Sequence, residues 1–306
     1  MRRIIVGTRG SKLALAQTKS VINTIMETNP AVQLTLTRIT TQGDRLREVP
    51  LQRLPGAGIF VKELEAALLA GEIDMAVHSL KDIPTEIPTG LSLAGVTMRL
   101  DPRDALVSRE EGLHELASGC LIGTGSPRRT VQLLDCRSDL IVRQVRGNVD
   151  TRLRKVSSGE LDGVIVAAAA LIRLGWDEKI TEYLTVDDFL PAVGQGALGI
   201  EIRSDDREMA DLMGKLNHQP TWCSILAERA FLRSLGGGCR APIAALGEVS
   251  GDVLSLQGMV AGPESRVVLR GSGDGSANDP EWLGDQLAQR MFEMGAADII
   301  NEVKAL

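Results

Sequence analysis

A short pattern that occurs twice in the chain limits its fold more than any other feature. Residues 71–77 read GEIDMAV and residues 159–165 read GELDGVI, and each copy follows a predicted helix and leads into a predicted strand. We interpret the two copies as the same αβ unit, used once in each of two related domains. The segments Ser79–Asp82 and Ala167–Ala170 then occupy equivalent strand ends. Because ligands of doubly wound sheets bind beyond the carboxyl ends of strands, the pattern predicts a site between two facing domains.

The remaining segments predict an α/β protein with three domains. The first doubly wound domain is predicted at residues 1–97 plus 196–217, with strands at 3–7, 34–40 and 73–77. The second is predicted at residues 98–195, with strands at 120–123, 139–146 and 163–169. Residues 218–306 are predicted to form a small α+β domain, in which strands at 243–246, 253–260 and 267–271 follow one another as hairpins.

Composition excludes several classes of protein. The chain has 306 residues, of which 43% are hydrophobic, and its formal net charge of −6 does not favour nucleic-acid binding. The start, MRRIIVGTRGSKLALAQ, has no long apolar run, and no later segment is long and apolar enough for a membrane span. We therefore expect a cytoplasmic protein, and we expect it to be a monomer. The four cysteines lie far apart and the histidines are scattered, which predicts free thiols and no metal site.

Three consecutive glycines, Gly236–Gly238, precede Cys239 and remove side chains from around its thiol. Glycine also permits backbone conformations and close approaches that a β-carbon would block. One interpretation is a flexible turn that ends in a small buried cysteine. The other is a thiol against which a bulky group can sit, and the glycines alone do not decide between the two.

Arginines gather in the middle of this acidic chain, near predicted strand ends and helix starts. Arg128 and Arg129 follow Ser126 and Pro127, which suit the N-cap and the first position of a helix. Guanidinium groups beside the free N–H groups of a helix start bind carboxylates or phosphates, so several arginines indicate a polyanionic ligand. The other arginines assigned to this site are Arg9, Arg146, Arg152 and Arg173. Those interpreted as a solvated helix face are Arg137, Arg143 and Arg154.

One acid, Asp82, follows the strand predicted at 73–77 and precedes a proline-containing loop. Aspartate in such a loop commonly stabilises a turn. The alternative is a functional carboxylate at the mouth of the cleft, whose charge state is set by Lys81 and the nearby arginines.

Five longer motifs occur in a fixed order: HSLKDIP at 78–84, GTGSPRR at 123–129, RGNVDTR at 146–152, PAVGQGALGIE at 191–201 and GGGCRAPI at 236–243. In their order and spacing the sequence resembles the porphobilinogen deaminase (hydroxymethylbilane synthase) family. The resemblance covers essentially the whole chain and is thinnest beyond Gly262. It implies two domains similar to type II periplasmic binding proteins and a third domain with a small antiparallel sheet.

The resemblance also implies an activity, that of a transferase in porphyrin and haem biosynthesis. In the family the GGGC cysteine, here Cys239, carries a covalent dipyrromethane cofactor through a thioether. Four porphobilinogens are added to it one at a time, each with loss of ammonia, and hydrolysis releases the linear tetrapyrrole hydroxymethylbilane. Asp82 matches the catalytic aspartate, which contacts pyrrole N–H groups and stabilises their positive charge.

Further family positions carry over residue by residue. Besides Cys239, the cofactor positions are Ser79, Lys81, Thr124, Ser126, Arg128, Arg129, Arg146, Gly147 and Ala167. The substrate positions are Arg9, Ser11, Arg152, Arg173 and Gln195. The partner implied is the small molecule porphobilinogen, with no metal, nucleic acid or membrane. Pro127 and Arg240 stand at positions where other residues also occur, and neither has a proposed role.

Two other functions remain open at this point. A two-domain polyanion receptor or effector module fits the repeat and the arginines, although the GGGC segment and the lack of a signal peptide disfavour it. A transferase that acts on a phosphorylated substrate predicts a metal-binding pair of acids, which the sequence does not offer. The intact mass of the protein separates the three, because an adduct of two pyrrole units on Cys239 supports the deaminase.

Overall fold

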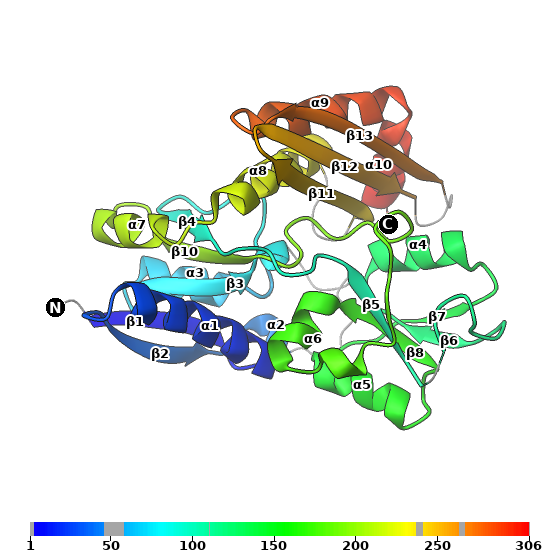
Figure 1. Cartoon of the computed structure of the whole chain (residues 1–306), viewed down its shortest axis with the longest axis horizontal. Helices are drawn as coiled ribbons and strands as arrows, with labels where there is room; N and C mark the ends of the chain where they lie inside the picture. The colour runs from blue at the N-terminus through cyan, green and yellow to red at the C-terminus, as the bar shows by residue number, and fades with distance from the viewer. Residues whose placement is uncertain (1–2, 46–57, 110, 237–240, 263–266, 306) are drawn as a thin grey trace.

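Three β-sheets, each covered by its own helices, make up the structure (Figure 1). The computed structural model describes residues 3–45, 58–109, 111–236, 241–262 and 267–305. Two of the sheets are mixed and five-stranded, and the third is antiparallel and three-stranded. Within these ranges, no helix combines the length and the apolar character needed to cross a bilayer.

In the first sheet the strand order is β2 (Gln33–Ile39), β1 (Arg3–Arg9), β3 (Met75–Ser79), β10 (Leu198–Arg203) and β4 (Leu91–Val96). Only β10 is antiparallel to its described neighbours, β3 and β4. Helices α1 (Lys12–Thr28) and α7 (Arg207–Gly214) bury Ile25 and Met213 against one face. Helix α3 (Lys62–Leu69), which follows the short α2 (Gln42–Arg45), buries Leu64 and Leu68 against the other face. Burial on both faces explains the short apolar runs of the inner strands β1 and β3.

The second sheet repeats this order with β7 (Ile141–Arg143), β6 (Leu121–Gly123), β8 (Gly163–Ala167), β5 (Asp104–Ser108) and β9 (Glu182–Tyr183). Its helices are α4 (Pro127–Cys136), α5 (Val149–Ser157), α6 (Ala168–Leu174) and the 3₁₀ turn η3 (Asp177–Lys179). The sheet orders confirm the predicted class of two doubly wound domains. The strand predicted at 139–146 is shorter than expected, because β7 lies at the sheet edge and pairs with the three-residue β6.

The repeated sequence pattern has the same structure in both domains. The backbone N–H of Asp74 donates to Ile5 O at 2.8 Å, and Asp74 Oδ2 accepts from Ile5 N at 2.8 Å. In the second domain Asp162 makes the same pair of contacts with Leu121, at 2.9 Å and 2.7 Å. Each aspartate also pairs with an arginine at the end of the antiparallel strand: Arg203 is the last residue of β10, and Arg109 directly follows β5. The interpretation of the two copies as one repeated unit is therefore confirmed.

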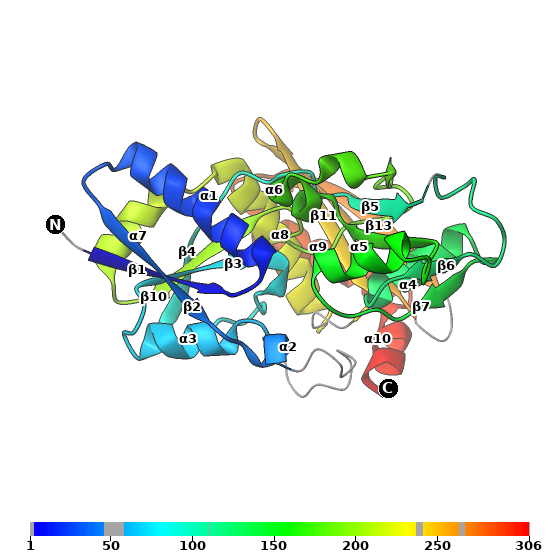
Figure 2. The ribbon, with the colours of Figure 1, turned by 90° about the horizontal axis from the view of Figure 1, so that it is seen from below.

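Two connections join the domains, and they contact each other midway. The chain crosses from β4 to β5 through residues 97–103 and returns from β9 to β10 through residues 184–197. Leu100 N donates to Gly196 O at 3.1 Å, and Gln195 Nε2 donates to Pro102 O at 2.8 Å. Away from these connections, α1 of the first domain also packs beside α6 of the second (Figure 2). The exact domain boundaries at 97/98, 195/196 and 217/218 stay predictions.

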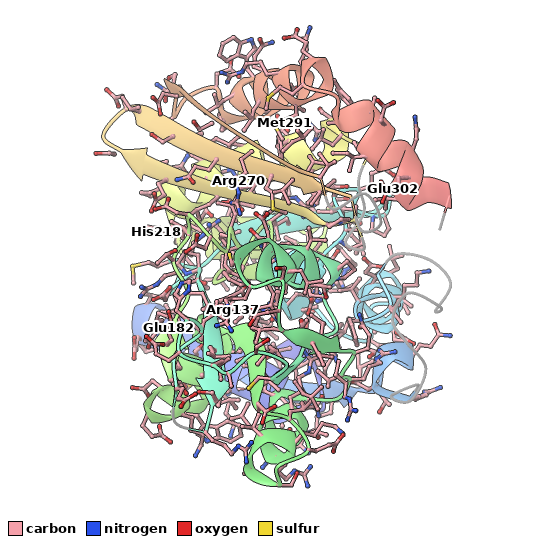
Figure 3. The ribbon with its side chains drawn as sticks, turned by 90° about the vertical axis from the view of Figure 1, so that its right-hand side faces the viewer. Arg137, Glu182, His218, Arg270, Met291 and Glu302 are labelled. Carbon is pink, nitrogen blue, oxygen red and sulfur yellow. The ribbon has the colours of Figure 1, made fainter. Side chains whose placement is uncertain are left out.

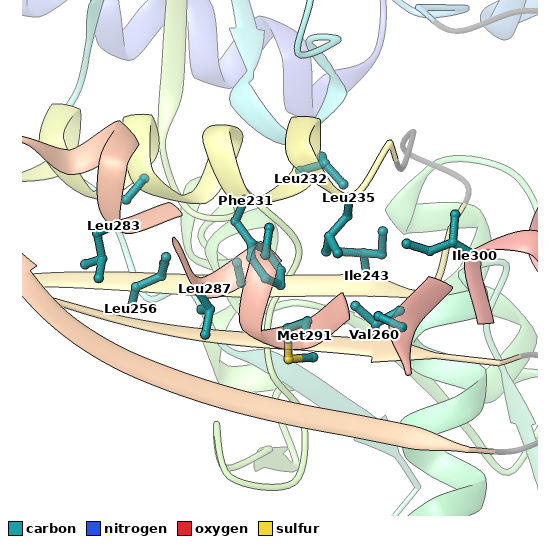
Figure 4. Close-up of a cluster of buried hydrophobic side chains, with 14 of the residues drawn as sticks. Phe231, Leu232, Leu235, Ile243, Leu256, Val260, Leu283, Leu287, Met291 and Ile300 are labelled. Atoms are coloured by element: carbon teal, nitrogen blue, oxygen red, sulfur yellow. The ribbon is translucent and has the colours of Figure 1, made fainter. Parts of the chain in front are cut away.

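The third unit places α8 (Gln219–Ser234), α9 (Pro280–Glu293) and α10 (Ala296–Ala305) with strands β11 (Ile243–Ser250), β12 (Val253–Ala261) and β13 (Val268–Ser276). Its core holds Phe231, Leu256, Leu287 and Met291 between the helices and one face of the sheet (Figure 4). It is anchored to both connections by the fully buried Glu228 on α8. That carboxylate accepts from Arg99 Nη2 at 2.6 Å, from Gly194 N at 2.7 Å and from Gly247 N at 2.9 Å.

Candidate active site

The HSLKD segment forms the end of β3 and the 3₁₀ turn η2 (Leu80–Asp82). Leu80 is buried beneath the turn, while Lys81 and Asp82 are partly exposed. Ser79 Oγ accepts a hydrogen bond from Gln17 Nε2 on α1 at 2.7 Å. The turn therefore presents Lys81 and Asp82 at the carboxyl end of β3, as expected for a ligand site of a doubly wound sheet.

The backbone that follows Asp82 is held by the third domain. Arg229 of α8 donates to the carbonyls of Ile83 at 3.2 Å, Pro84 at 2.6 Å and Thr85 at 3.1 Å. One guanidinium thus satisfies three carbonyls of an irregular segment and limits its movement. The chain that leads to the GGGC segment is thereby tied to the turn that carries Asp82.

A buried carboxylate, Asp104, lies at the centre of the arginine cluster. It is 0% exposed and begins β5. Arg128 Nη2 donates to its Oδ2 at 2.7 Å, and Arg129 Nη2 donates to its Oδ1 at 2.7 Å. Burial alone would raise the pKa of Asp104, but the positive charges of Arg128 and Arg129 hold it well below its ordinary value. Asp104 therefore stays ionised between the two arginines.

The remaining nitrogens of this arginine pair reach backbone. Arg128 Nη1 donates to Leu190 O at 2.6 Å, and Arg129 Nη1 donates to Ile165 O at 3.0 Å. Arg129 Nε is buried and has no hydrogen-bond partner among the described residues. Burial also lowers the pKa of Arg128, even though Asp104 opposes that change. The cluster thus keeps positive charge in a place where water solvates it poorly.

Gln195 links this cluster to Lys81. Its Nε2 donates to Asp104 Oδ1 at 2.8 Å, and its Oε1 accepts from Lys81 Nζ at 3.1 Å. Desolvation, followed by the positive charge of Arg129, lowers the pKa of Lys81 to about 8, although Asp82 and Asp104 act in the opposite direction. The structure therefore brings Lys81, Gln195, Arg128 and Arg129 together across the two domains.

A second group lies at the edge of the second sheet, beyond β6 and β7. The turn between β6 and α4 contains Thr124 and Ser126, and Thr124 Oγ1 accepts from Ser126 N at 3.2 Å. Ser126 occupies the N-cap position, but its hydroxyl makes no capping bond to the helix. Arg152 Nε donates to Gly147 O at 3.0 Å, which places α5 against the neighbouring loop.

Desolvation also lowers the pKa of the arginines at this edge of the sheet, Arg152 and Arg146. It lowers the pKa of Arg152 to about 10, with further effects from the positive charges of Arg129 and Arg146. The pKa of Arg146 is lowered by burial as well, and its Nη1 is buried without a partner in the described part of the chain. The positive charges of Arg129 and Arg146 can act on Arg152 in this way only if both guanidinium groups lie close to it.

Arg173 and Ala167 flank the same region from α6 and β8. Arg173 Nη2 donates to Gly196 O at 2.7 Å, so it contacts the returning connection next to Gln195. Burial lowers the pKa of Arg173 to about 10. Ala167 pairs with Asp104 in the register of β8 and β5, which puts it beside the arginine pair.

Two predicted residues lie in the first domain with contacts of their own. Arg9 donates to both carboxylate oxygens of Asp44, at 3.1 Å and 2.7 Å, and its guanidinium carbon lies 4.2 Å from the centre of the Phe60 ring. Ser11 caps α1 by accepting from Ala14 N at 3.1 Å. Cys239 lies outside the described residues, and so does Arg240.

Sequence reasoning missed Asp104, Glu228 and Arg229, which organise this site. For Asp104 a signal was present, because this acid opens the apolar run DALV shortly after the domain boundary predicted at 97/98. The interpretation of Arg137 as part of a solvated face was wrong. Arg137, the C-cap residue of α4 (labelled in Figure 3), donates to the carbonyls of Leu113 and Leu116 and to Asp139.

Comparisons with known proteins agree with this arrangement. The family model described as "Porphobilinogen deaminase, dipyromethane cofactor binding domain" matches residues 4–211, and "Porphobilinogen deaminase, C-terminal domain" matches residues 222–293. A porphobilinogen deaminase of Lysinibacillus sphaericus (strain C3-41) is 47% identical over 307 residues, which is 100% of this chain and 98% of the relative. That of Pelotomaculum thermopropionicum (strain DSM 13744 / JCM 10971 / SI) is 45% identical over 304 residues, 99% of this chain and 97% of the relative.

Among solved structures, the methionine binding protein MetQ is similar with a TM-score of 0.43 and 14% identity, over 70% of this chain and 89% of MetQ. A likeness at that level adds nothing to what the sheet orders already show. The family models and the full-length relatives do decide the matter: the chain belongs to the porphobilinogen deaminase family.

Proposed function

We propose that this chain joins four porphobilinogen molecules stepwise, with loss of ammonia, onto a dipyrromethane cofactor on Cys239 and releases hydroxymethylbilane by hydrolysis. The observation that carries the proposal is the desolvated arginine cluster of the second domain, which Gln195 links to Lys81 at the carboxyl end of β3. Arg129 and Arg146 lie close enough to Arg152 for their positive charges, together with burial, to lower the pKa of Arg152 to about 10. Such a cluster is stabilised by a ligand that brings several negative charges.

The residues present fit a dipyrromethane, whose pyrrole rings carry acetate and propionate carboxylates. Arg129 Nε and Arg146 Nη1 are buried donors without partners in the described part of the chain. The turn between β6 and α4 adds the free backbone N–H groups of a helix start. We assign the cofactor carboxylates to Arg128, Arg129 and Arg146, with Ser79, Lys81, Thr124, Ser126, Gly147 and Ala167 around them. We assign the substrate to Arg9, Ser11, Arg152, Arg173 and Gln195.

The chain's own residues then have distinct tasks. When bound, the dipyrromethane supplies the electron-rich terminal ring to which new pyrrole units are joined. Asp82, partly exposed on η2, accepts hydrogen bonds from pyrrole nitrogens and stabilises the positive charge that develops there. Lys81 and the arginines orient the carboxylates, and burial of the cluster strengthens each of these contacts by excluding water.

Two further assignments follow from the same proposal. We assign the protein to the cytoplasm and expect it to act as a monomer. A polyanion receptor remains the second candidate, favoured by the fold alone.

The deciding experiment combines intact mass with product analysis. The purified chain is expected to carry an adduct of two pyrrole units and to release one ammonia for each porphobilinogen consumed. The matched control is Cys239→Ser, which should carry no such adduct. An unmodified wild-type chain that binds porphobilinogen without consuming it would establish the receptor instead.

A further inference from the structure

We propose that Asp104 is a positioning residue: its carboxylate sets the directions of Arg128 and Arg129 and, through Gln195, holds Lys81 beside Asp82. The inference deepens the proposed function and rests on it. It concerns a side chain that no motif identified, and it assigns to that side chain a task on both domains.

The first observation is the convergence of two neighbouring arginines. Adjacent residues on a helix point about 100° apart around its axis. Arg128 and Arg129 nevertheless meet, because each places one Nη2 atom 2.7 Å from a different oxygen of Asp104. Their Nη1 atoms are fixed by Leu190 O and Ile165 O, which belong to different elements. Two contacts on each guanidinium define its plane, and Asp104 supplies one of the two in both cases.

The second observation is the orientation of the Gln195 amide. Its Nε2 has two acceptors, Asp104 Oδ1 and Pro102 O, both at 2.8 Å. An amide that donates on one side must present its oxygen on the other, and that oxygen accepts from Lys81 Nζ at 3.1 Å. Asp104 therefore fixes the orientation of the Gln195 amide in which its oxygen faces the ammonium group of Lys81.

The third observation is the place of Asp104 in the chain. It is the first residue of β5, directly after the outgoing connection, and Gln195 lies in the returning one. The path from Lys81 to the arginines thus runs through the point where the two connections touch. The distance and direction from Lys81 to the two arginines therefore depend on how the two connections are placed against each other.

A purely structural role makes a different prediction from a positioning role. A carboxylate that only neutralises buried arginines affects stability and leaves the pH dependence of the site unchanged. The charged groups that act on Lys81 are Asp82, Asp104, Arg128 and Arg129. Asp104 favours the ammonium form of Lys81. Removing the negative charge of Asp104 must therefore move the alkaline limb, which is the fall of activity at high pH as Lys81 loses its proton, to lower pH.

The test compares Asp104→Asn with Asp74→Asn in the full chain. Asp74 is a suitable control, because it is ion-paired with Arg203 at the start of β3 and is no part of the proposed site. Each variant is purified with its cofactor status checked by intact mass, and porphobilinogen turnover is measured against pH. We expect Asp104→Asn to lose at least about tenfold in kcat/KM and its alkaline limb to fall by about half a pH unit or more.

The other arms make the result decisive. Asp74→Asn should lose thermal stability and keep the wild-type limb, and Asp104→Glu should return the limb toward the wild-type position. A wild-type limb in folded Asp104→Asn would overturn the inference, as would equal limb shifts in both Asn variants. If Asp104→Asn does not fold, Gln195→Met replaces it in the test, because this variant leaves the ion pairs of Arg128 and Arg129 with Asp104 intact. The alkaline limb of Gln195→Met must then lie at lower pH than that of the wild type. A wild-type limb in Gln195→Met would overturn the inference. Failure of wild-type turnover would instead overturn the proposed function itself.

Discussion

The ammonium group of Lys81 lies 3.1 Å from the side-chain oxygen of Gln195, so the turn after β3 contacts the segment that returns from the second domain. This contact joins the residue beside Asp82 to the connection between domains. A ligand that contacts Lys81 therefore also lies beside the connection that returns from the second domain.

Replacement of Asp82 by asparagine should lower kcat by at least about 10²-fold, which is the scale for loss of a positioned electrostatic or acid–base group. The substitution is nearly isosteric, so folding and cofactor attachment should persist. Asp82→Glu keeps the charge one methylene away and should retain more activity. Single-turnover incubation with porphobilinogen, followed by intact mass, gives the bound chain lengths. Successive additions at the wild-type rate in Asp82→Asn would show that Asp82 is only a turn residue.

The arginines should differ in the step at which their loss acts. Arg128→Ala or Arg129→Ala should impair cofactor assembly, whereas Arg152→Ala or Arg173→Ala should stall chain extension. Loss of one partner of a desolvated charge pair costs about 2–5 kcal/mol, hence about 30-fold or more in rate or affinity. Lysine should rescue only partly, because it lacks the planar fork.

The matched control for these variants is Arg154→Ala, at an exposed arginine of α5 whose side chain donates a hydrogen bond to Thr151 of the same helix. Intact mass separates the chain that lacks cofactor from the chain that stops at an intermediate length. Wild-type rates in all four variants would show that the cluster is no binding site.

Lys81 should confer a pH dependence on cofactor uptake. Its folded pKa of about 8 lies below the ordinary 10.5, so the ammonium form is lost as the pH rises through about 8. We expect the rate of cofactor assembly in the cofactor-free chain to fall over that range. Lys81→Arg should move the fall to higher pH, because arginine remains protonated. An unchanged profile in Lys81→Arg would assign the titration to another group.

The same shift makes Lys81 costly for stability. A lysine with a lowered folded pKa destabilises the protein fully below pH 8, and the cost disappears as the pH rises from 8 to 10.5. Lys81→Met should therefore raise the free energy of unfolding at pH 7 by up to about 3 kcal/mol, less where solvent screens the partly exposed group. Urea unfolding at pH 7 and pH 10 should show a gain that shrinks at the higher pH.

Much of the fold could be predicted because its signals are local. The helical periodicity of residues 12–28 in the sequence predicts a helix there, and α1 occupies that range, since Ser11 caps it and apolar side chains recur along one face. The repeat predicted two equivalent sheets, because Asp74 and Asp162 stand at the same place in each unit. Signals of this kind lie within a few residues of the structure that they specify.

The centre of the site could not be predicted, because its contacts depend on topology. Asp104 meets Arg128 and Arg129 only once β5 has crossed into the second sheet beside β8. Likewise, the pairing of Arg9 with Asp44 depends on where α2 lies after β2. The motifs placed arginines near strand ends, but the buried acid between them carries no motif of its own.

Cys239→Ser should abolish cofactor attachment and nearly all activity while it leaves the fold intact. Serine is small and unbranched, so packing should change little, but its hydroxyl is a far poorer nucleophile than a thiolate. Intact mass should lack the two-pyrrole adduct, and circular dichroism should match the wild-type spectrum. A normal adduct with full activity in this variant would place the attachment at another residue.

The connections themselves can be tested at Gly196, where the two meet. Gly196 has φ +93°, and an added Cβ would lie 2.5 Å from Leu100 O, a backbone atom that cannot rotate away. The matched control is Gly175, which has φ +67° but offers open space to a Cβ. Gly175→Ala should cost about 1 kcal/mol for backbone conformation alone, and Gly196→Ala about 2–4 kcal/mol. Because Gly196 O also accepts from Arg173, only Gly196→Ala should slow chain extension. Equal losses in stability and rate for the two variants would show that the close approach of the connections has no part in function.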